Sequence, residues 1–161
     1  VRIAAGDNFA CAVVRSAGSA GSLWCWGGIS NNAVWNSKTP RLVETLAGNV
    51  LDVAAGFDHV CALVEANPGN GDVYCWGNNL VGQLGQGFTN FSVSNPDDGV
   101  VPLRVKGLSK ATALFAASGS TCALTVSQRV ACWGDNHAGL FGAGTDAGPI
   151  TLPVVMKGLC A

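Results

Sequence analysis

The chain has 161 residues, a formal net charge of −1, and charged residues at only 12% of its positions, whereas 48% are hydrophobic. It has no basic run, so neither nucleic-acid binding nor a polybasic contact with a membrane has electrostatic support. No apolar run approaches the roughly 18 residues of a membrane-spanning helix, and membrane insertion is not expected. Short apolar pieces alternate instead with 22 glycines and many asparagines, which is typical of an all-β protein rich in turns.

The same succession of predicted strands occurs three times in chain order. Each unit opens with an apolar strand, continues with a strand around a Cys, turns back into a strand ending in Cys-Trp-Gly, and closes with a strand led by Pro. The units cover residues 1–49, 50–109 and 110–161, and their opening strands are aligned at Ile3, Val53 and Phe115. An internal repeat of this length indicates a repeat architecture.

Strand alternation predicts how each sheet packs. In the third strand of the second unit, Val73 and Cys75 point to one face, and Tyr74 and Trp76 point to the other. Both faces are apolar, so the sheet must be covered on both sides. Four-stranded sheets of this kind, repeated in tandem, stack as blades of a β-propeller. A β-sandwich is the alternative, but it does not predict so regular a repeat.

Six of the seven cysteines form pairs with even separations of 14, 14 and 10, as directly opposed residues of a regular hairpin require. This spacing predicts three disulfides, each worth about 3 kcal/mol in the chain-entropy model, between Cys11 and Cys25, Cys61 and Cys75, and Cys122 and Cys132. Zinc would need Cys-x-x-Cys spacing or nearby His, so no metal or other cofactor is expected. Cys160 has no partner in the pattern. It is expected to be free, to lie at the end of an excised piece, or to form a bridge to another segment or chain.

The second unit contains, in order, Ala-Ala-Gly, His-Val-Cys-Ala-Leu, Val-Tyr-Cys-Trp-Gly-Asn-Asn, Gly-Gln-Leu-Gly and Pro-Leu-Arg-Val-Lys-Gly-Leu. This order resembles the regulator-of-chromosome-condensation repeat, and the resemblance covers essentially the whole chain. It is weakest in the first unit, where Trp35 and Ser37 stand at positions held by glycine in the other units. The resemblance implies propeller blades, typically seven in a ring, of which this chain supplies three.

Three blades leave an apolar sheet face open at each end, and further blades or further copies are expected to cover these faces. The chain begins in the middle of the pattern at Val1, so it is interpreted as a mature or excised piece of something longer.

The predicted disulfides decide which function the resemblance suggests. Guanine-nucleotide exchange on a small GTPase, the nuclear function of the family, takes place in a reducing compartment where such bridges do not persist. The sequence therefore predicts a non-enzymatic, secreted or cell-surface module that acts as a protein-interaction or structural assembly scaffold. The alternative is a secreted inhibitor, because propellers of this family resemble proteins that inhibit β-lactamases. The sequence shows no nucleophile paired with a general base, so a hydrolytic enzyme is not predicted.

Two histidines and a glycine-rich segment are the remaining candidates for chemistry. His59 stands where the other units have Phe9 and Ser120, which favours a packing role, and His137 is interpreted as an exposed loop residue. The glycines between Gly82 and Gly87 precede neither a Lys nor a helix, so they predict turns and not a phosphate site.

The longest loop, residues 88–101, is the predicted partner-contact region. Its sequon at Asn90 is a candidate N-glycosylation site, and its two adjacent carboxylates are too few to predict calcium binding. The candidate contact residues, which include one from the first-unit loop, are Trp35, Phe88, Phe91, Asp97 and Asp98.

Overall fold

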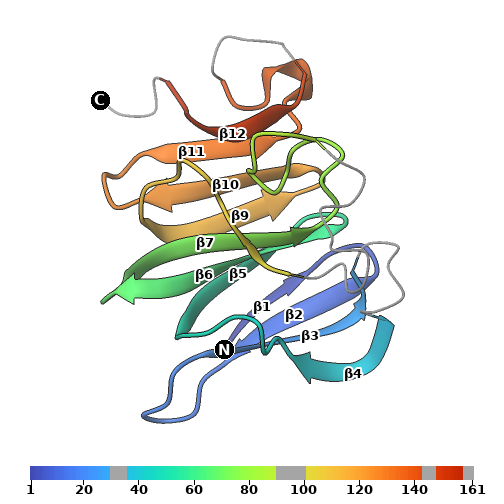
Figure 1. Cartoon of the computed structure of the whole chain (residues 1–161), viewed down its shortest axis with the longest axis vertical. Helices are drawn as coiled ribbons and strands as arrows, with labels where there is room; N and C mark the ends of the chain where they lie inside the picture. Colours follow the sequence, from blue (N-terminus) through green and yellow to red (C-terminus); the bar gives the residue numbers. More distant parts are fainter. Residues whose placement is uncertain (30–35, 90–100, 143–147, 158–161) are drawn as a thin grey trace.

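A computed structural model of the chain describes residues 1–29, 36–89, 101–142 and 148–157. Its strands form one four-stranded and one eight-stranded antiparallel sheet, and the eight-stranded sheet consists of two groups joined by a single residue pair, Gly71 with Ala111. The three successive groups follow one another from blue to red in Figure 1. Blade 1 comprises β1 (Arg2–Ala5), β2 (Phe9–Val14), β3 (Ser22–Gly28) and β4 (Asn36–Leu42). Blade 2 comprises β5 (Val50–Ala55), β6 (His59–Asn67), β7 (Asn70–Gly77) and β8 (Leu103–Arg104). Blade 3 comprises β9 (Ala111–Ala117), β10 (Ser120–Thr125), β11 (Val130–Gly134) and β12 (Ile150–Val155), with a short 3-10 helix, η2 (His137–Gly139), before β12. The predicted all-β fold is confirmed.

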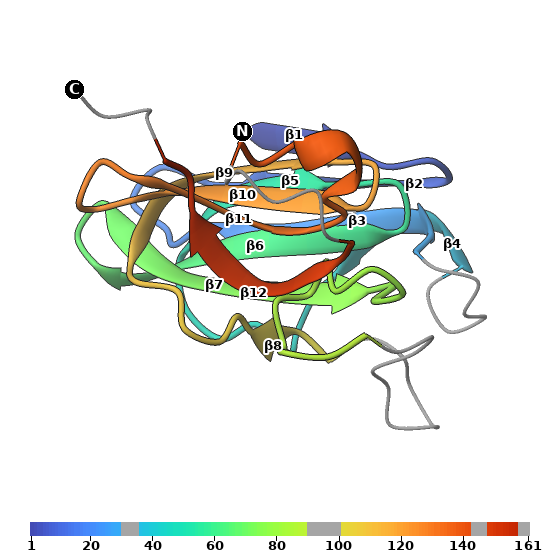
Figure 2. The same cartoon turned by 90° about the horizontal axis from the view of Figure 1, so that it is seen from above.

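The blades are stacked as in a propeller. Figure 2 shows their first strands, β1, β5 and β9, together along one side of the molecule, with β4, β8 and β12 toward the other. Each later first strand packs on the first two strands of the preceding blade. Backbone hydrogen bonds link the turns that follow these strands in series: Asp7 N donates to Phe57 O over 3.0 Å, and Phe57 N to Ser118 O over 2.8 Å.

The hydrophobic core lies between the blades. One cluster joins Cys11 and Cys25 of blade 1 to Val53, Val60 and Trp76 of blade 2. A second joins the opposite face of blade 2 to blade 3, where Leu114 and Trp133 are buried. The predicted alternation is confirmed, since Val73 and Cys75 belong to the second cluster whereas Trp76 and Tyr74 pack in the first.

The first strand of blade 3 differs by one residue from the predicted alignment. Ala4 pairs with Cys11, Ala54 with Cys61, and Phe115 with Cys122. Phe115 is therefore equivalent to the two alanines, and Leu114 is the equivalent of Ile3 and Val53. The alignment from small residues was wrong because Ala117 stands where the other blades have Gly6 and Gly56.

In all three blades the third strand ends at the same side of the sheets as the first strand, so the described parts of the connections that follow the third strands lie beside the turns after the first strands (Figure 1). We call this end of the stack the loop end. The short hairpin turns between second and third strands lie at the opposite end (Figure 1). Within the described part of the chain, no helix is long and apolar enough to cross a membrane.

Candidate protein-interaction surface

The structure contains all three predicted disulfides. In each blade the two cysteines stand directly opposite each other on the second and third strands, with Cα atoms 4.1 Å apart. Each bridge therefore ties together the two central strands of its sheet. The bridges of blades 1 and 2 are fully buried beneath the next blade.

The tryptophan after the second cysteine of each pair points to the opposite face, toward the preceding blade. Trp76 and Trp133 are 1% and 0% exposed, and the indole Nε1 of Trp133 donates a hydrogen bond to Gln83 O over 2.8 Å. Trp26 is only half-buried, because blade 1 is the first in the stack. The tryptophan of this tripeptide is therefore buried against the preceding blade in blades 2 and 3, whereas in blade 1 it lies on a partly exposed face.

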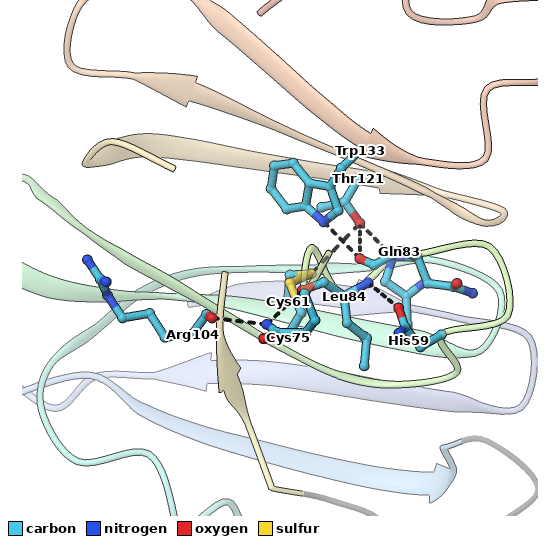
Figure 3. Close-up of a disulfide and its surroundings, with 10 residues drawn as sticks. His59, Cys61, Cys75, Gln83, Leu84, Arg104, Thr121 and Trp133 are labelled. Atoms are coloured by element: carbon cyan, nitrogen blue, oxygen red, sulfur yellow. Dashed lines mark hydrogen bonds between the residues drawn. A yellow bond between two sulfur atoms is a disulfide. The ribbon is translucent and has the colours of Figure 1, made fainter. Parts of the chain in front are cut away.

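His59 lies inside the joint between blades 2 and 3. Its Nε2 lies 2.8 Å from Thr121 Oγ1, and the same hydroxyl lies 3.3 Å from Gln83 O (Figure 3). Its Nδ1 is buried and has no hydrogen-bond partner among the residues that the structure describes. Burial lowers the pKa of His59 to about 4, because desolvation disfavours the charged ring. This histidine is a neutral packing residue at physiological pH, in keeping with the sequence-based interpretation.

The glycine-rich segment after β7 is a compact turn supported by an asparagine. Asn79 Oδ1 accepts Leu84 N over 3.1 Å, and in blade 3 Asn136 Oδ1 accepts Phe141 N over 2.9 Å in the same way. Gly85 has a φ of +67°, and a Cβ there would meet Val105 at 2.7 Å. These glycines are required by the fold.

A hollow of about 220 Å3 opens at the loop end between blades 2 and 3. Its walls combine apolar side chains with two carboxylates, and its lining residues include Phe57, Asp58, Leu80, Val81, Ser118 and Asp135. Partial burial, and secondly the charge of Asp7, raise the pKa of Asp58. The Asp58 side chain makes no hydrogen bond or ion pair with any other described residue. Sequence reasoning missed this hollow, because turns from two blades form it.

The second carboxylate of the hollow is paired. His137 Nδ1 lies against Asp135 Oδ1, and His137 N donates to the same oxygen over 3.0 Å. Partial burial would raise the pKa of Asp135, but these hydrogen bonds lower it overall. His137 is exposed, as predicted. Phe57 and Leu80, which line the hollow, expose 55% and 46% of their surface, and Leu140 after η2 exposes 63%. The loop end therefore offers apolar contacts beside negative charge.

An ion-pair cluster lies at the other end of the same joint. Asp72 on β7 accepts Arg104 Nη2 of β8 over 2.6 Å and Lys110 Nζ, just before β9, over 2.5 Å. Burial alone would raise the pKa of Asp72, but the two cations lower it overall. Blade 1 has Ser22 and Leu42 at the positions of Asp72 and Arg104, so this cluster is specific to the second joint.

Among the predicted contact residues, Phe88 lies in the described part of the chain. It is 43% exposed, its carbonyl accepts Asn79 Nδ2 over 2.9 Å, and Lys106 Nζ lies 5.8 Å from the centre of its ring. This places the start of the loop beside β8. The other residues lie outside the described residues, so a role in contact, glycosylation or bridging stays a prediction for Trp35, Asn90, Phe91, Asp97, Asp98 and Cys160.

The comparisons with known proteins agree with this geometry. The model of the regulator of chromosome condensation (RCC1) repeat matches residues 70–124, from β7 of blade 2 to β10 of blade 3. No curated protein sequence matches the chain.

Three solved structures illustrate the likeness. Human WBSCR16 is 17% identical with a TM-score of 0.75, over 96% of this chain and 38% of that one. Yeast RCC1 (Prp20), solved bound to Kap60, is 20% identical with a TM-score of 0.74, over 98% of this chain and 37% of that one. The ectodomain of the receptor kinase CR4 from the moss Physcomitrella patens is 26% identical with a TM-score of 0.50, over 82% of this chain and 28% of that one.

The fold and the repeat define a class: the chain is a three-bladed part of a β-propeller with one disulfide in each blade. Residues 70–124 match the RCC1 repeat, as the sequence motifs predicted, and the fold of the chain is similar to that of the yeast RCC1 propeller. It spans less than two fifths of the length of the propellers it matches.

Proposed function

We propose that this protein is a non-enzymatic extracellular or cell-surface module that binds other proteins and takes part in their assembly. The observation that carries the proposal is the disulfide at the same place in every blade. Three repeated bridges are expected in an oxidising compartment and are rare in the cytosol and nucleus. The similarity to the ectodomain of a moss receptor kinase supports the same environment.

A protein-binding role is supported by the loop end. The loop end has a hollow lined in part by Asp58, whose side chain has no hydrogen bond or ion pair among the described residues. Three apolar side chains are exposed at the same end: Phe57, Leu80 and Leu140. Protein interfaces use this combination of apolar anchors and charge. Yeast RCC1 was solved in complex with the protein Kap60, so binding of proteins is compatible with this fold. Fold alone does not transfer a partner, and nuclear exchange activity is not part of the proposal.

Neither histidine of the chain supports catalysis. His59 is buried and neutral against Thr121, with a pKa of about 4, and His137 is held by Asp135 at the exposed rim. A general base needs a pKa near the working pH and a substrate within reach. We therefore propose binding and not chemical turnover.

The state of the thiols tests the proposal. The protein is isolated from its natural source in the presence of an alkylating agent and analysed by mass spectrometry with and without reduction. We expect the six bridged cysteines to escape alkylation until the protein is reduced. Alkylation of all six without reduction would place the protein in a reducing compartment and overturn the extracellular assignment.

A second measurement tests dependence on oxidation. The chain is produced once in an oxidising and once in a reducing compartment, and urea unfolding is followed for both. Loss of three bridges, each worth about 3 kcal/mol, is expected to leave the reduced chain unfolded or nearly so. A reduced chain as stable as the oxidised one would contradict the proposal.

A further inference from the structure

The hollow between blades 2 and 3 is held in shape by its own hydrogen bonds. Gln83, the buried residue of its lining, is 4% exposed. Its Oε1 accepts Val81 N over 2.9 Å, and its Nε2 donates to Asn78 Oδ1 over 3.4 Å. Its backbone carbonyl accepts the indole of Trp133 over 2.8 Å, as Figure 3 shows. These amide groups are therefore satisfied before any ligand enters, and the hollow is preformed.

The polar groups left over in the hollow are negatively charged. The Asp58 carboxylate has no hydrogen bond or ion pair among the described residues, and the two hydrogen bonds from His137 to Asp135 both end on Oδ1. No Lys or Arg is among the described residues that line the hollow. Partial burial, and secondly the charge of Asp7, raise the pKa of Asp58, because the ionised carboxyl lacks a compensating cation. The hollow is therefore complementary to a positively charged group.

The joint between blades 1 and 2 shows that the fold does not require these charges. By strand register, Asn8 after β1 is equivalent to Asp58, and Asn78 after β7 is equivalent to Asp135. Asn78 Oδ1 accepts the N–H two residues later over 2.7 Å, and Asp135 Oδ1 does the same over 3.0 Å. An amide oxygen thus supports the turn as a carboxylate does. The first joint has a neutral pair where the second has two carboxylates, which indicates a use outside the fold.

The apolar part of the lining favours a guanidinium over an ammonium group. Phe57 and Leu80 line the same hollow and are 55% and 46% exposed. Arginine is more weakly hydrated than lysine, pairs with carboxylates through parallel hydrogen bonds and stacks on aromatic rings. The volume of about 220 Å3 is smaller than the about 300 to 1,000 Å3 of sites for drug-sized ligands. The hollow therefore suits a single side chain.

We propose that this hollow binds an arginine side chain of a partner protein, with the guanidinium paired with the carboxylates of Asp58 and Asp135 and against the ring of Phe57. The inference rests on the protein-binding part of the proposed function and names the group that the partner contributes. All the lining residues come from blades 2 and 3, and Phe57 N donates to Ser118 O over 2.8 Å, so the two blades hold the site together.

Titration of the oxidised chain with a short peptide tests the inference. The probe is acetyl-Leu-Arg-Leu-amide, and the control peptide has citrulline in place of arginine, which keeps the shape and removes the charge. In amide NMR spectra at neutral pH, the arginine peptide is expected to cause saturable shifts at lining residues such as Asn78 and Gly119. The citrulline peptide should bind about tenfold more weakly, because charge-assisted hydrogen bonds carry the affinity. A lysine peptide should also bind more weakly than the arginine peptide.

Two variants of the chain assign the binding to the two carboxylates. Asp58→Asn and Asp135→Asn each place in blade 2 or 3 the amide that the preceding blade has at that position, so both variants are expected to fold. Each should weaken binding of the arginine peptide about threefold to tenfold and leave the citrulline peptide unaffected. Glu44→Gln is the matched control: Glu44 is exposed after β4, at the end of the stack opposite the loop end, and its loss should leave both affinities unchanged.

Four results would overturn the inference: no saturable shift at the hollow, a citrulline peptide that binds equally well, a lysine peptide that binds equally well, or an unchanged affinity in either aspartate variant. Any of them, together with three intact bridges in the natural protein, would contradict the choice of arginine and leave the extracellular assignment in place. Free thiols in the natural protein would overturn that assignment without altering the peptide titration.

Discussion

Blades 1 and 3 carry the same Cys-Trp-Gly tripeptide at opposite ends of the stack, yet their tryptophans differ in burial. Trp133 is fully buried against the disulfide face of blade 2, with its indole bonded to Gln83 O. Trp26 has the same neighbours along the chain and the same place opposite the second strand, but it is half-exposed. The comparison shows that the hairpin with its disulfide is a local structure, whereas burial of the tryptophan depends on a preceding blade.

The largest expected effect comes from deleting these two side chains. Trp133→Ala is expected to lower the free energy of unfolding by about 3–5 kcal/mol, because it opens a cavity inside a joint. Trp26→Ala should cost about 1 kcal/mol or less, since that ring already contacts solvent. Both losses are measured by urea unfolding of the oxidised chain. Equal losses would refute the distinction between closed joint and open face.

The loss of folding stability in acid distinguishes blade 1 from the joint between blades 2 and 3. Blade 1 has Phe9 at the position of His59, so the buried histidine lies in the joint between blades 2 and 3 and has no counterpart in the joint between blades 1 and 2. The folded state holds the pKa of His59 at about 4, below its ordinary 6.5, so the unfolded chain binds the proton more strongly. Stability should therefore fall by up to about 3 kcal/mol as the pH drops from 6.5 to 4. In His59→Phe this loss should disappear; parallel profiles for the two proteins would show that another group is responsible.

The disulfides allow a comparison between a fully buried bridge in blade 2 and a partly buried bridge in blade 3. Replacing Cys61 and Cys75 by Ser opens a loop with a sequence separation of 14, whereas Cys122 and Cys132 are separated by 10. Chain entropy predicts losses of about 3.0 and about 2.8 kcal/mol. Nearly equal losses in calorimetry would show that the bridges act on the unfolded chain. A much larger loss for the buried pair would show that packing beneath the next blade dominates.

The smallest expected effect distinguishes the two joints from each other. Asp72→Asn removes the ion pair with Arg104 inside blade 2 and the ion pair with Lys110, which links blade 2 to the start of blade 3. The expected loss is at most about 1 kcal/mol, and it should shrink at high salt because exposed charges are screened. Since the pKa of Asp72 is lowered in the folded state, its ion pairs stabilise the fold fully above the ordinary Asp pKa. This stabilisation is lost only at a lower pH than the one at which the loss caused by His59 is complete. A loss that does not depend on salt would indicate packing in place of charge.

Much of the fold could be predicted from local pattern. The cysteine pairs follow from the even spacing of opposed residues, and the faces of β7 follow from alternation. The offset of β9 was missed although a signal was present: the first strand residue that pairs with the Cys stands seven positions before it in all three blades. Small residues were a poorer guide, because Ala117 replaces a glycine in blade 3.

The candidate site could not be predicted in the same way. The hollow at the loop end is lined by turns from two blades, and Asp58 is desolvated by neighbours that are distant in sequence. Likewise, His59 meets Thr121 across 62 positions. Only Phe88 of the predicted contact residues lies in the described chain, and it stands beside β8 and Lys106.

The sequence by itself determined the repeat, the strands and the three bridges, because each depends on residues within one hairpin and on the two-residue period of a strand. Only the tertiary structure decided which tryptophans are buried, that Phe115 stands on an open face, and that His59 is enclosed with Thr121. Those outcomes depend on how one blade stacks on the next, and stacking is governed by contacts between residues some 50 to 60 positions apart, which local pattern does not encode.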